Sequence, residues 1–443
     1  MNLTHLLSPL QNCPCGRAHR LPPMAVEIAP GLLARTDELL AANNFPRALL
    51  VVADKNTLGA SPGILDVLAA GGFHCDLKLY DDMRTADMRD VHTLTGLCEN
   101  VGGVLSVGSG SLNDICRLAS FHAGKAFAIF ATAPSMDGFA SDSAPITENN
   151  FKTSISCHAP SVIIGDTEIL ARAPATLKSA GFGDMLAKYI ALVDWHAARL
   201  TIGEYHCPRV AAITETALRR VTAMADRVTV NDPETAGAIM EALVMTGLAM
   251  TLAGCVRPAS GCEHMISHFW EIKKLEHGQL SDFHGRKVGV ATLMAARLYH
   301  ELAALENIVF HEDAADWDAV YAAYGPNFTR DIQACNTPSV ADETTPERLR
   351  ACWPEIRALV QTILPSPEAL LALLRAAGAP TTPEEIAITP ELAAAGLEFH
   401  PYMRHRMTLS RLRGMMAPQG FRLPTLGSLR EGAPPAGGEG VPR

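Results

Sequence analysis

Short apolar runs that alternate with helix-length stretches restrict how the first part of this chain can fold. Five such runs read as strands, at residues 47–53, 75–80, 103–107, 126–131 and 161–164. Most are continuously apolar, which indicates strands buried on both faces of a parallel sheet. We therefore expect a doubly wound, Rossmann-like α/β domain over residues 25–165, preceded by an N-terminal arm at residues 1–24. In such a sheet ligands bind at the carboxyl ends of the strands.

The pattern changes after about residue 166. Strand-like runs give way to helix patterns, at residues 184–200, 209–227, 234–252, 258–275, 287–304, 345–363, 367–376 and 402–416. Such amphipathic periodicity predicts an all-α C-terminal domain over residues 166–417. Residues 418–443 are rich in Pro and Gly, which predicts a loose tail.

A cluster of histidines lies in the helical part, at His264, His268, His277 and His284. His264 and His268 are four residues apart, so a helix places them on one face. His284 follows a predicted loop, opens the next helix and can fold back over that face. A single histidine is more often an ordinary polar residue, but several imidazoles with one carboxylate suit a divalent transition metal. Asp184 in GFGDMLAKY is the carboxylate candidate. The His-Glu-x-x-His motif of zinc peptidases is absent from this stretch, because the glutamate precedes the histidine.

A glycine-rich turn, VGSGSLNDICRLA at residues 107–119, joins a predicted strand to a predicted helix. Glycines such as Gly108 and Gly110 let the backbone approach a phosphate, and a helix N-terminus offers free amide groups. The full dinucleotide fingerprint is incomplete, because Asn113 stands at the third glycine position. The place of the turn after a strand, with Asp114 in the first helical turn, favours a pyrophosphate site over a plain tight turn.

Charge and composition exclude some partners and suggest a compartment. The chain of 443 residues has a net charge of -10 and no long basic run, which argues against nucleic acid and anionic membranes as partners. We find no apolar run of the roughly 20 residues that span a membrane. The N-terminus also lacks the charged region of a signal peptide. The eleven scattered cysteines indicate reduced thiols and a cytoplasmic location.

Cys13, Cys15 and His19 form a C-x-C-x3-H group in the N-terminal arm. Such a group can bind a second metal or form a strained disulfide. It lacks the second half of a zinc module, so we expect free thiols here.

Five motifs taken together resemble those of the sn-glycerol-1-phosphate dehydrogenases: VGSGSLND, TAPSMDGFAS, GFGDMLAKY, RPASGCEHMISH and FHGRKVGV. This family belongs to the iron-type alcohol dehydrogenase and dehydroquinate synthase superfamily. The motifs run in the family's order from about Asp54 to Met294, and each alone would be weak. Cys262 departs from the pattern, since serine is expected there. The resemblance implies a dehydroquinate synthase-like fold and a homo-oligomer, a homodimer or larger.

The resemblance also implies the residues of the site. Asp184, His264 and His284 would hold one divalent metal, which in the family is zinc, nickel or iron. The insertion that contains His277 leaves the third ligand open. NAD(H), or alternatively NADP(H), would be bound by Asp54, Gly108, Gly110, Ser111, Leu112, Asn113, Asp114, Thr132, Ala133, Pro134, Ser135 and Ser141. The substrate would contact Asp137, Asp184 and His268.

The implied reaction is the reversible, metal-dependent reduction of dihydroxyacetone phosphate by NAD(P)H to sn-glycerol 1-phosphate. Three protein ligands leave an open coordination position, and the metal acts as a Lewis acid on the ketone. Lys188, one turn after Asp184, would neutralise phosphate or be a solvated helix lysine. One alternative is an iron-type glycerol or alcohol dehydrogenase acting on an unphosphorylated polyol. A dehydroquinate synthase-like lyase is the other, although it needs more basic residues than we find.

Overall fold

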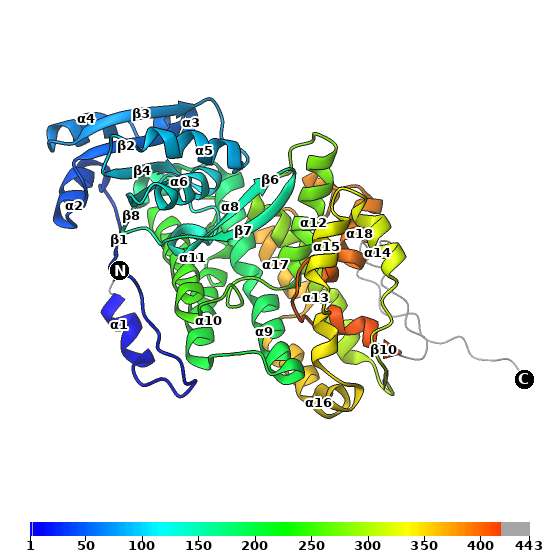
Figure 1. Cartoon of the computed structure of the whole chain (residues 1–443). Coiled ribbons are helices and arrows are strands. Elements are labelled where there is room, and N and C mark those ends of the chain that lie inside the picture. The colour runs from blue at the N-terminus through cyan, green and yellow to red at the C-terminus, as the bar shows by residue number, and fades with distance from the viewer. Residues whose placement is uncertain (2, 418–443) are drawn as a thin grey trace, which may run out of the picture.

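The computed structural model describes residues 1 and 3–417 and begins with a six-stranded parallel sheet (Figure 1). The strand order is β1-β8-β5-β4-β2-β3. The strands are β1 (Ala25–Ala29), β2 (Ala48–Asp54), β3 (His74–Tyr80), β4 (Gly103–Gly108), β5 (Ala126–Ala131) and β8 (Val162–Asp166). An antiparallel hairpin of β6 (Ser143–Glu148) and β7 (Phe151–Ser156) is inserted before β8.

Both faces of the central strands β2, β4, β5 and β8 are buried, as the continuous apolar runs predict. In β2, Leu49 and Val51 pack on one face with a cluster that includes residues of α2 (Thr36–Ala42) and α4 (Ile64–Ala70). The intervening Leu50 and Val52 pack on the other face with residues of α5 (Met88–Leu97) and α6 (Gly110–His122). The alternation follows from the two-residue period of a strand. The same second cluster continues into the helical part, so one core joins the two parts.

After β8 the chain is mainly helical, as expected. The helices are α7 (Thr167–Arg172), α8 (Ala175–Leu186), α9 (Lys188–Ile202), α10 (Pro208–Thr222), α11 (Pro233–Ala253), α12 (Cys262–Glu276), α13 (His284–Ala304), α14 (Trp317–Tyr324), α15 (Thr329–Cys335), α16 (Pro346–Ile363), α17 (Pro367–Ala376) and α18 (Pro390–Phe399). The predicted fold class, a parallel α/β part followed by a helical part, is confirmed. The predicted loose tail at 418–443 lies outside the described residues.

Several predicted elements are wrong in detail. The helix predicted to start at residue 184 starts earlier, because α8 already contains Asp184 and a single residue, Ala187, separates α8 from α9. Residues 402–416 form no α-helix. There the backbone N–H of Leu409 donates to the buried Asp194 carboxylate at 2.8 Å, a tertiary bond in place of a helical one. Strand β1 and the β6-β7 hairpin were not predicted.

The expectation that no segment is long and apolar enough for a membrane is wrong for α11. This helix has 21 residues and passes by length and composition, but 83% of its most apolar window is buried inside the protein. Helix α11 is therefore a core helix, which is apolar on all sides because it is surrounded on all sides.

The topology places a binding crevice at the ends of β2 and β4. In the sheet, β3 lies on one side of β2. The strands β4, β5 and β8, which follow β3 in the chain, lie on the other side of β2. The crossovers diverge at this point, which leaves a gap at the carboxyl edge of the sheet where ligands bind. Asp54 ends β2, and the glycine-rich turn follows β4.

Candidate metal and dinucleotide site

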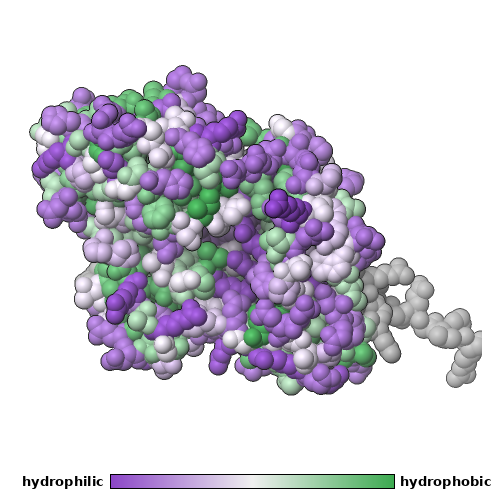
Figure 2. Space-filling view, in the orientation of Figure 1, coloured by the Kyte–Doolittle hydropathy of each residue, from purple (hydrophilic) through white to green (hydrophobic). Residues whose placement is uncertain are grey.

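A cavity of about 530 Å³ lies at this crevice and extends down to the helical part. Figure 2 shows the surface recessed between the two parts of the molecule. The cavity is lined by the end of β2, by Ser109 directly after β4, by the N-terminus of α6, by the loop after β5, and by residues of α12 and α13. Its size falls in the range typical of small-ligand sites.

Three predicted metal ligands meet at the helical end of this cavity. Asp184 from α8, His264 from α12 and His284 from α13 each offer a ligand atom, and these atoms lie within 4.8 Å of one another. The Nε2 atom of His264 is 3.5 Å from Oδ1 of Asp184. His277, the alternative third ligand, is exposed at the end of α12. The donor set of two imidazoles and a carboxylate, with the two histidines facing a cavity, fits a divalent transition metal with an open position.

Glycines allow the helices that carry these ligands to approach closely. A Cβ on Gly181 would lie 1.9 Å from the carbonyl oxygen of Pro134, and one on Gly285 would lie 1.9 Å from that of Ala180. A Cβ on Gly183 would lie 2.5 Å from the carbonyl oxygen of Gly285. Helices α8 and α13 therefore touch backbone to backbone, which brings Asp184 beside His284.

Glu263, which the sequence reading did not assign to the site, orients His264. Its Oε1 atom is 2.6 Å from Nδ1 of the imidazole and also accepts the backbone N–H of Gly261 at 2.9 Å. This bond leaves Nε2 of the ring facing Asp184. Burial tends to lower the pKa of His264, but hydrogen bonds to Asp184 and Glu263 outweigh it and raise that pKa to about 9.

Lys188 occupies neither of its predicted places, since it contacts no solvent and does not line the cavity. Its ammonium group lies 2.8 Å from Oδ1 of Asp184 and 2.5 Å from Oδ2 of Asp137. Asp137 in turn donates its backbone N–H to Oδ2 of Asp184 at 2.9 Å. Burial of two carboxylates side by side needs a counter-charge, which the lysine supplies. Lys188 thus positions the ligand Asp184 and the predicted substrate residue Asp137.

The glycine-rich turn forms the N-terminus of α6 and faces the other end of the cavity. Gly110 has a positive φ of 35°, and a Cβ there would meet no atom within 4 Å. No side chain of the described residues caps this helix, so its first amide groups are available to an anion. Gly108 plays a different part, because a Cβ there would lie 2.5 Å from Leu112. These observations fit a bound pyrophosphate.

Asp54 lines the cavity beside this turn. Its carboxylate caps α3 (Lys55–Ala60) by accepting the backbone N–H of Thr57 at 2.8 Å, and it also accepts that of Met83 at 3.2 Å. These bonds hold the side chain at the strand end where a ribose would lie. Carboxylate oxygens can accept further hydrogen bonds, so a contact with a ribose stays open to Asp54.

The predicted cofactor residues divide into two groups. One group lines the cavity: Asp54, Gly110, Ser111, Leu112, Asp114, Ser135 and Ser141. The other group does not line it: Gly108, Asn113, Thr132, Ala133 and Pro134. Two members of the second group make hydrogen bonds within the protein. The side-chain oxygen of Asn113 accepts the hydroxyl of Ser106 at 2.7 Å, and the backbone N–H of Thr132 donates to the carbonyl oxygen of Gly108. Contact of these five residues with a cofactor stays a prediction.

Arg117, which was also not anticipated, holds the loop that carries Asp137. This fully buried arginine of α6 donates to the carbonyl oxygens of Gly138, Phe139 and Ser143. The loop after β5 has an irregular backbone, so its buried carbonyl groups need side-chain donors such as this guanidinium.

Basic side chains surround the cavity next to the histidines. Lys152, Lys287, Arg404 and Arg406 all line it, and so do the acidic residues Asp137, Glu271 and Asp282. Lys152 lies 3.1 Å and Lys287 lies 2.9 Å from the Glu271 carboxylate. The fold therefore gathers basic side chains that the sequence analysis did not assign to the site. These basic residues come from β7, α13 and the segment after α18, so no local sequence motif predicts that they lie together.

The electrostatics of this end favour an anion. Burial, together with the neighbouring guanidinium groups of Arg257 and Arg404, lowers the pKa of Arg406 to about 9. Burial likewise lowers the pKa of Lys287. Both shifts mean that burial destabilises the positively charged forms of these side chains, and a bound anion would stabilise them. His268 lines the same region, and burial keeps its pKa well below the ordinary value, so this imidazole is neutral.

Comparison with known proteins places this geometry in context. A sequence profile of the iron-containing alcohol dehydrogenase family matches residues 27–174. A glycerol-1-phosphate dehydrogenase [NAD(P)+] of Geobacillus stearothermophilus is 30% identical over 414 residues, which cover 92% of this chain and 96% of the relative. The enzyme of the same name from Halalkalibacterium halodurans is 34% identical over 317 residues, covering 67% and 77%.

Solved structures share the fold at lower identity. An alcohol dehydrogenase from an archaeal halo-thermophile of a Red Sea brine pool superposes with a TM-score of 0.61 at 15% identity, covering 89% of this chain and 97% of the other. A probable glycerol dehydrogenase of Sinorhizobium meliloti superposes with a TM-score of 0.60 at 18% identity, covering 90% and 96%. At these identities the likeness concerns the fold alone.

Proposed function

The chain belongs to the glycerol-1-phosphate dehydrogenase family, and on that premise we propose that it reduces dihydroxyacetone phosphate to sn-glycerol 1-phosphate with a nicotinamide dinucleotide and one divalent metal. The observation that carries the proposal is the continuity of the cavity. It joins a dinucleotide-type turn, a metal-type triad and a set of basic side chains. A phosphorylated ketone has the two groups that the metal and the cations would bind.

When bound, the cofactor supplies the hydride and the metal acts as a Lewis acid on the ketone. The chain's own residues bind and orient the reactants. Asp184, His264 and His284 would hold the metal, and Glu263 and Lys188 keep two of them in position. The turn at the start of α6 would hold the pyrophosphate.

Lys152, Lys287 and Arg404 would bind the substrate phosphate, because they bring more positive charge to the cavity wall than Glu271 neutralises. The neutral imidazole of His268 would donate a hydrogen bond to that phosphate or to the adjacent hydroxyl. Its Nδ1 atom is buried and has no hydrogen-bond partner among the described residues. Support of the metal shell is the competing role for His268.

Finer features of the proposal rest on the resemblance and on single residues. Asp54 at the end of β2 would disfavour the 2′-phosphate of NADPH, so NADH should be at least as good a cofactor. The metal is expected to be zinc, nickel or iron. A homo-oligomer and a cytoplasmic location stay predictions.

Steady-state NADH oxidation with dihydroxyacetone phosphate and with dihydroxyacetone tests the proposal. We expect a strong preference for the phosphorylated ketone. Replacement of Lys152 by Met should raise KM for dihydroxyacetone phosphate about tenfold or more and leave the use of dihydroxyacetone unchanged, since only one substrate carries the phosphate. Glu271 keeps its Lys287 partner in this variant. Lys125→Met, outside the cavity, is the matched control.

The other outcomes separate the alternatives. A preference of the wild type for dihydroxyacetone or glycerol would replace our proposal by a polyol dehydrogenase. A lyase reaction produces no net change in NADH, so cofactor turnover in proportion to substrate contradicts the lyase. Loss of metal from His268→Ala would assign that residue to the metal shell and withdraw its substrate role.

A further inference from the structure

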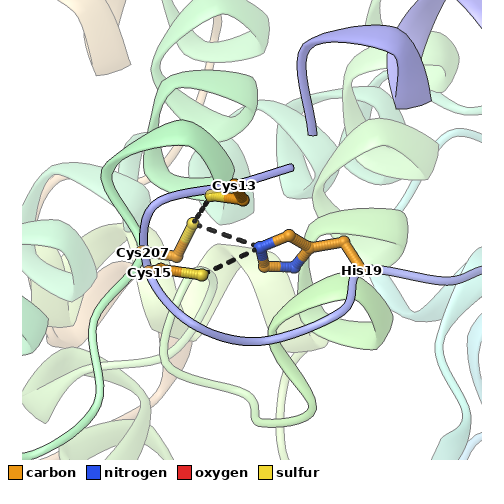
Figure 3. A group of neighbouring side chains, drawn as sticks. All are labelled: Cys13, Cys15, His19 and Cys207. Carbon is orange, nitrogen blue, oxygen red and sulfur yellow. Dashed lines mark hydrogen bonds between the residues drawn. The ribbon is translucent and has the colours of Figure 1, made fainter. Parts of the chain in front are cut away.

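A second group of metal-type side chains lies at the N-terminal arm, apart from the cavity. Cys13, Cys15 and His19 of the arm meet Cys207, the residue that precedes α10. Figure 3 shows the arm looping so that all four side chains point toward one common centre. The four ligand atoms lie within 4.8 Å of one another. The arm alone offers an incomplete set, and Cys207, which lies 188 residues after His19, completes it.

The distances equal the edges of a tetrahedral zinc site or are slightly shorter. With Zn–S of about 2.3 Å and Zn–N of about 2.0–2.1 Å, tetrahedral geometry places sulfurs about 3.8 Å apart and sulfur and nitrogen about 3.5 Å apart. The Sγ atoms of Cys13 and Cys207 are 3.5 Å apart, and Nε2 of His19 is 3.5 Å from Sγ of Cys207 and 3.1 Å from Sγ of Cys15. A disulfide requires sulfurs at about 2.05 Å, so the group as it stands is not bonded.

The surroundings prepare these atoms to bind a cation. Nδ1 of His19 is 2.8 Å from the carbonyl oxygen of Leu252, an acceptor that fixes the ring proton on Nδ1. The lone pair of Nε2 then faces the three sulfurs, as the bond between a ligand histidine and a carbonyl does in metal sites. Cys207 is the N-cap residue of the 15-residue helix α10, and burial raises the pKa of its thiol, so the thiolate needs a nearby cation.

We propose that Cys13, Cys15, His19 and Cys207 bind one structural zinc ion that fastens the N-terminal arm to the helical part. Three thiolates and an imidazole are a closed, four-ligand set of soft donors, typical of structural zinc and without an open position for chemistry. The site shares no residue with the triad of the cavity. It therefore does not depend on the proposed function.

The ion would add a cross-link to an arm that also packs against the helical part. Leu10 of the arm packs with Trp195, Val210 and Leu252 of the helical part, and partly buried residues of the arm border this cluster. Zinc adds a cross-link between residue 19 and residue 207. Closing such a long loop removes entropy from the unfolded chain, so the ion should stabilise the fold.

Metal content of the full-length protein, purified without chelator, tests the site. We expect two ions per chain in the wild type and one in Cys207→Ser, whereas Cys75→Ser on strand β3 keeps both. His264→Ala should lose the other ion. Cys207→Ser should also melt at a lower temperature and keep NADH binding at the cavity.

Cobalt substitution of the wild type gives a second readout that needs no variant. The cavity triad contains no sulfur, so a thiolate-to-cobalt charge-transfer band can come only from cysteine ligands such as this cluster. Absence of that band, or equal metal content in the wild type and Cys207→Ser, would overturn the proposal. So would an intact mass 2 Da below that of the reduced chain, with Cys13 and Cys207 in one disulfide-linked peptide pair.

Discussion

Replacement of Glu263 by Gln should weaken metal binding at the cavity without removing a ligand. The carboxylate lies 2.6 Å from Nδ1 of His264, and both side chains are buried. Loss of such a supporting partner costs about 10- to 100-fold in metal affinity, which corresponds to about 1.4 to 2.8 kcal/mol. The amide can still accept from Nδ1 and from the N–H of Gly261, but without the charge. We therefore expect a decrease near tenfold.

The assay is a competition titration of chelated protein with a metal-buffering indicator, with turnover measured at saturating metal. Glu271→Gln is the matched control, because it makes the same charge change on the same helix but removes a partner of Lys152 and Lys287. Its metal affinity should stay close to that of the wild type, and its substrate KM should change instead. Unchanged affinity in Glu263→Gln would refute the role of this hydrogen bond. An equal decrease in Glu271→Gln would show a general charge effect.

Three further predictions concern the rest of the cavity. His284→Ala should lose the catalytic metal and nearly all turnover, whereas His277→Ala, which alters an exposed helix end, should keep both; elemental analysis decides between these histidines. Asp54→Ala should shift the ratio of kcat/KM for NADH and NADPH toward NADPH, because a carboxylate near the ribose is removed; an unchanged ratio contradicts the placement of Asp54. Burial raises the pKa of Asp114 from 3.8 to about 7, so the folded state holds a proton that the unfolded chain releases between these values. This contribution to stability is present below pH 4 and is lost as the pH rises through 7, by up to about 4 kcal/mol. Asp114→Asn should therefore raise the melting temperature at pH 8 but not at pH 4.

The sequence by itself predicted five of the six strands of the sheet and the residues of the candidate metal triad. Continuous apolar runs predicted a parallel sheet buried on both faces, because strand burial leaves a local pattern in the residues. The spacing of His264 and His268 predicted that they share a helix face, and both lie on α12. The motifs that resemble the family brought Asp184 and His284 into the same prediction, and the fold places them together.

Only the tertiary structure decided which distant side chains meet. Lys188 reads locally as a surface lysine, yet it is buried between Asp137 and Asp184 because α9 packs beneath the loop that follows β5. Arg404 and Arg406 lie in a segment that reads as helical. They line a cavity whose other lining residues precede them by more than a hundred positions in the sequence. Cys207 carries no motif at all. Periodicity along the chain indicates which side of its helix or strand each residue lies on. Contacts between different helices and strands depend on how the whole core packs.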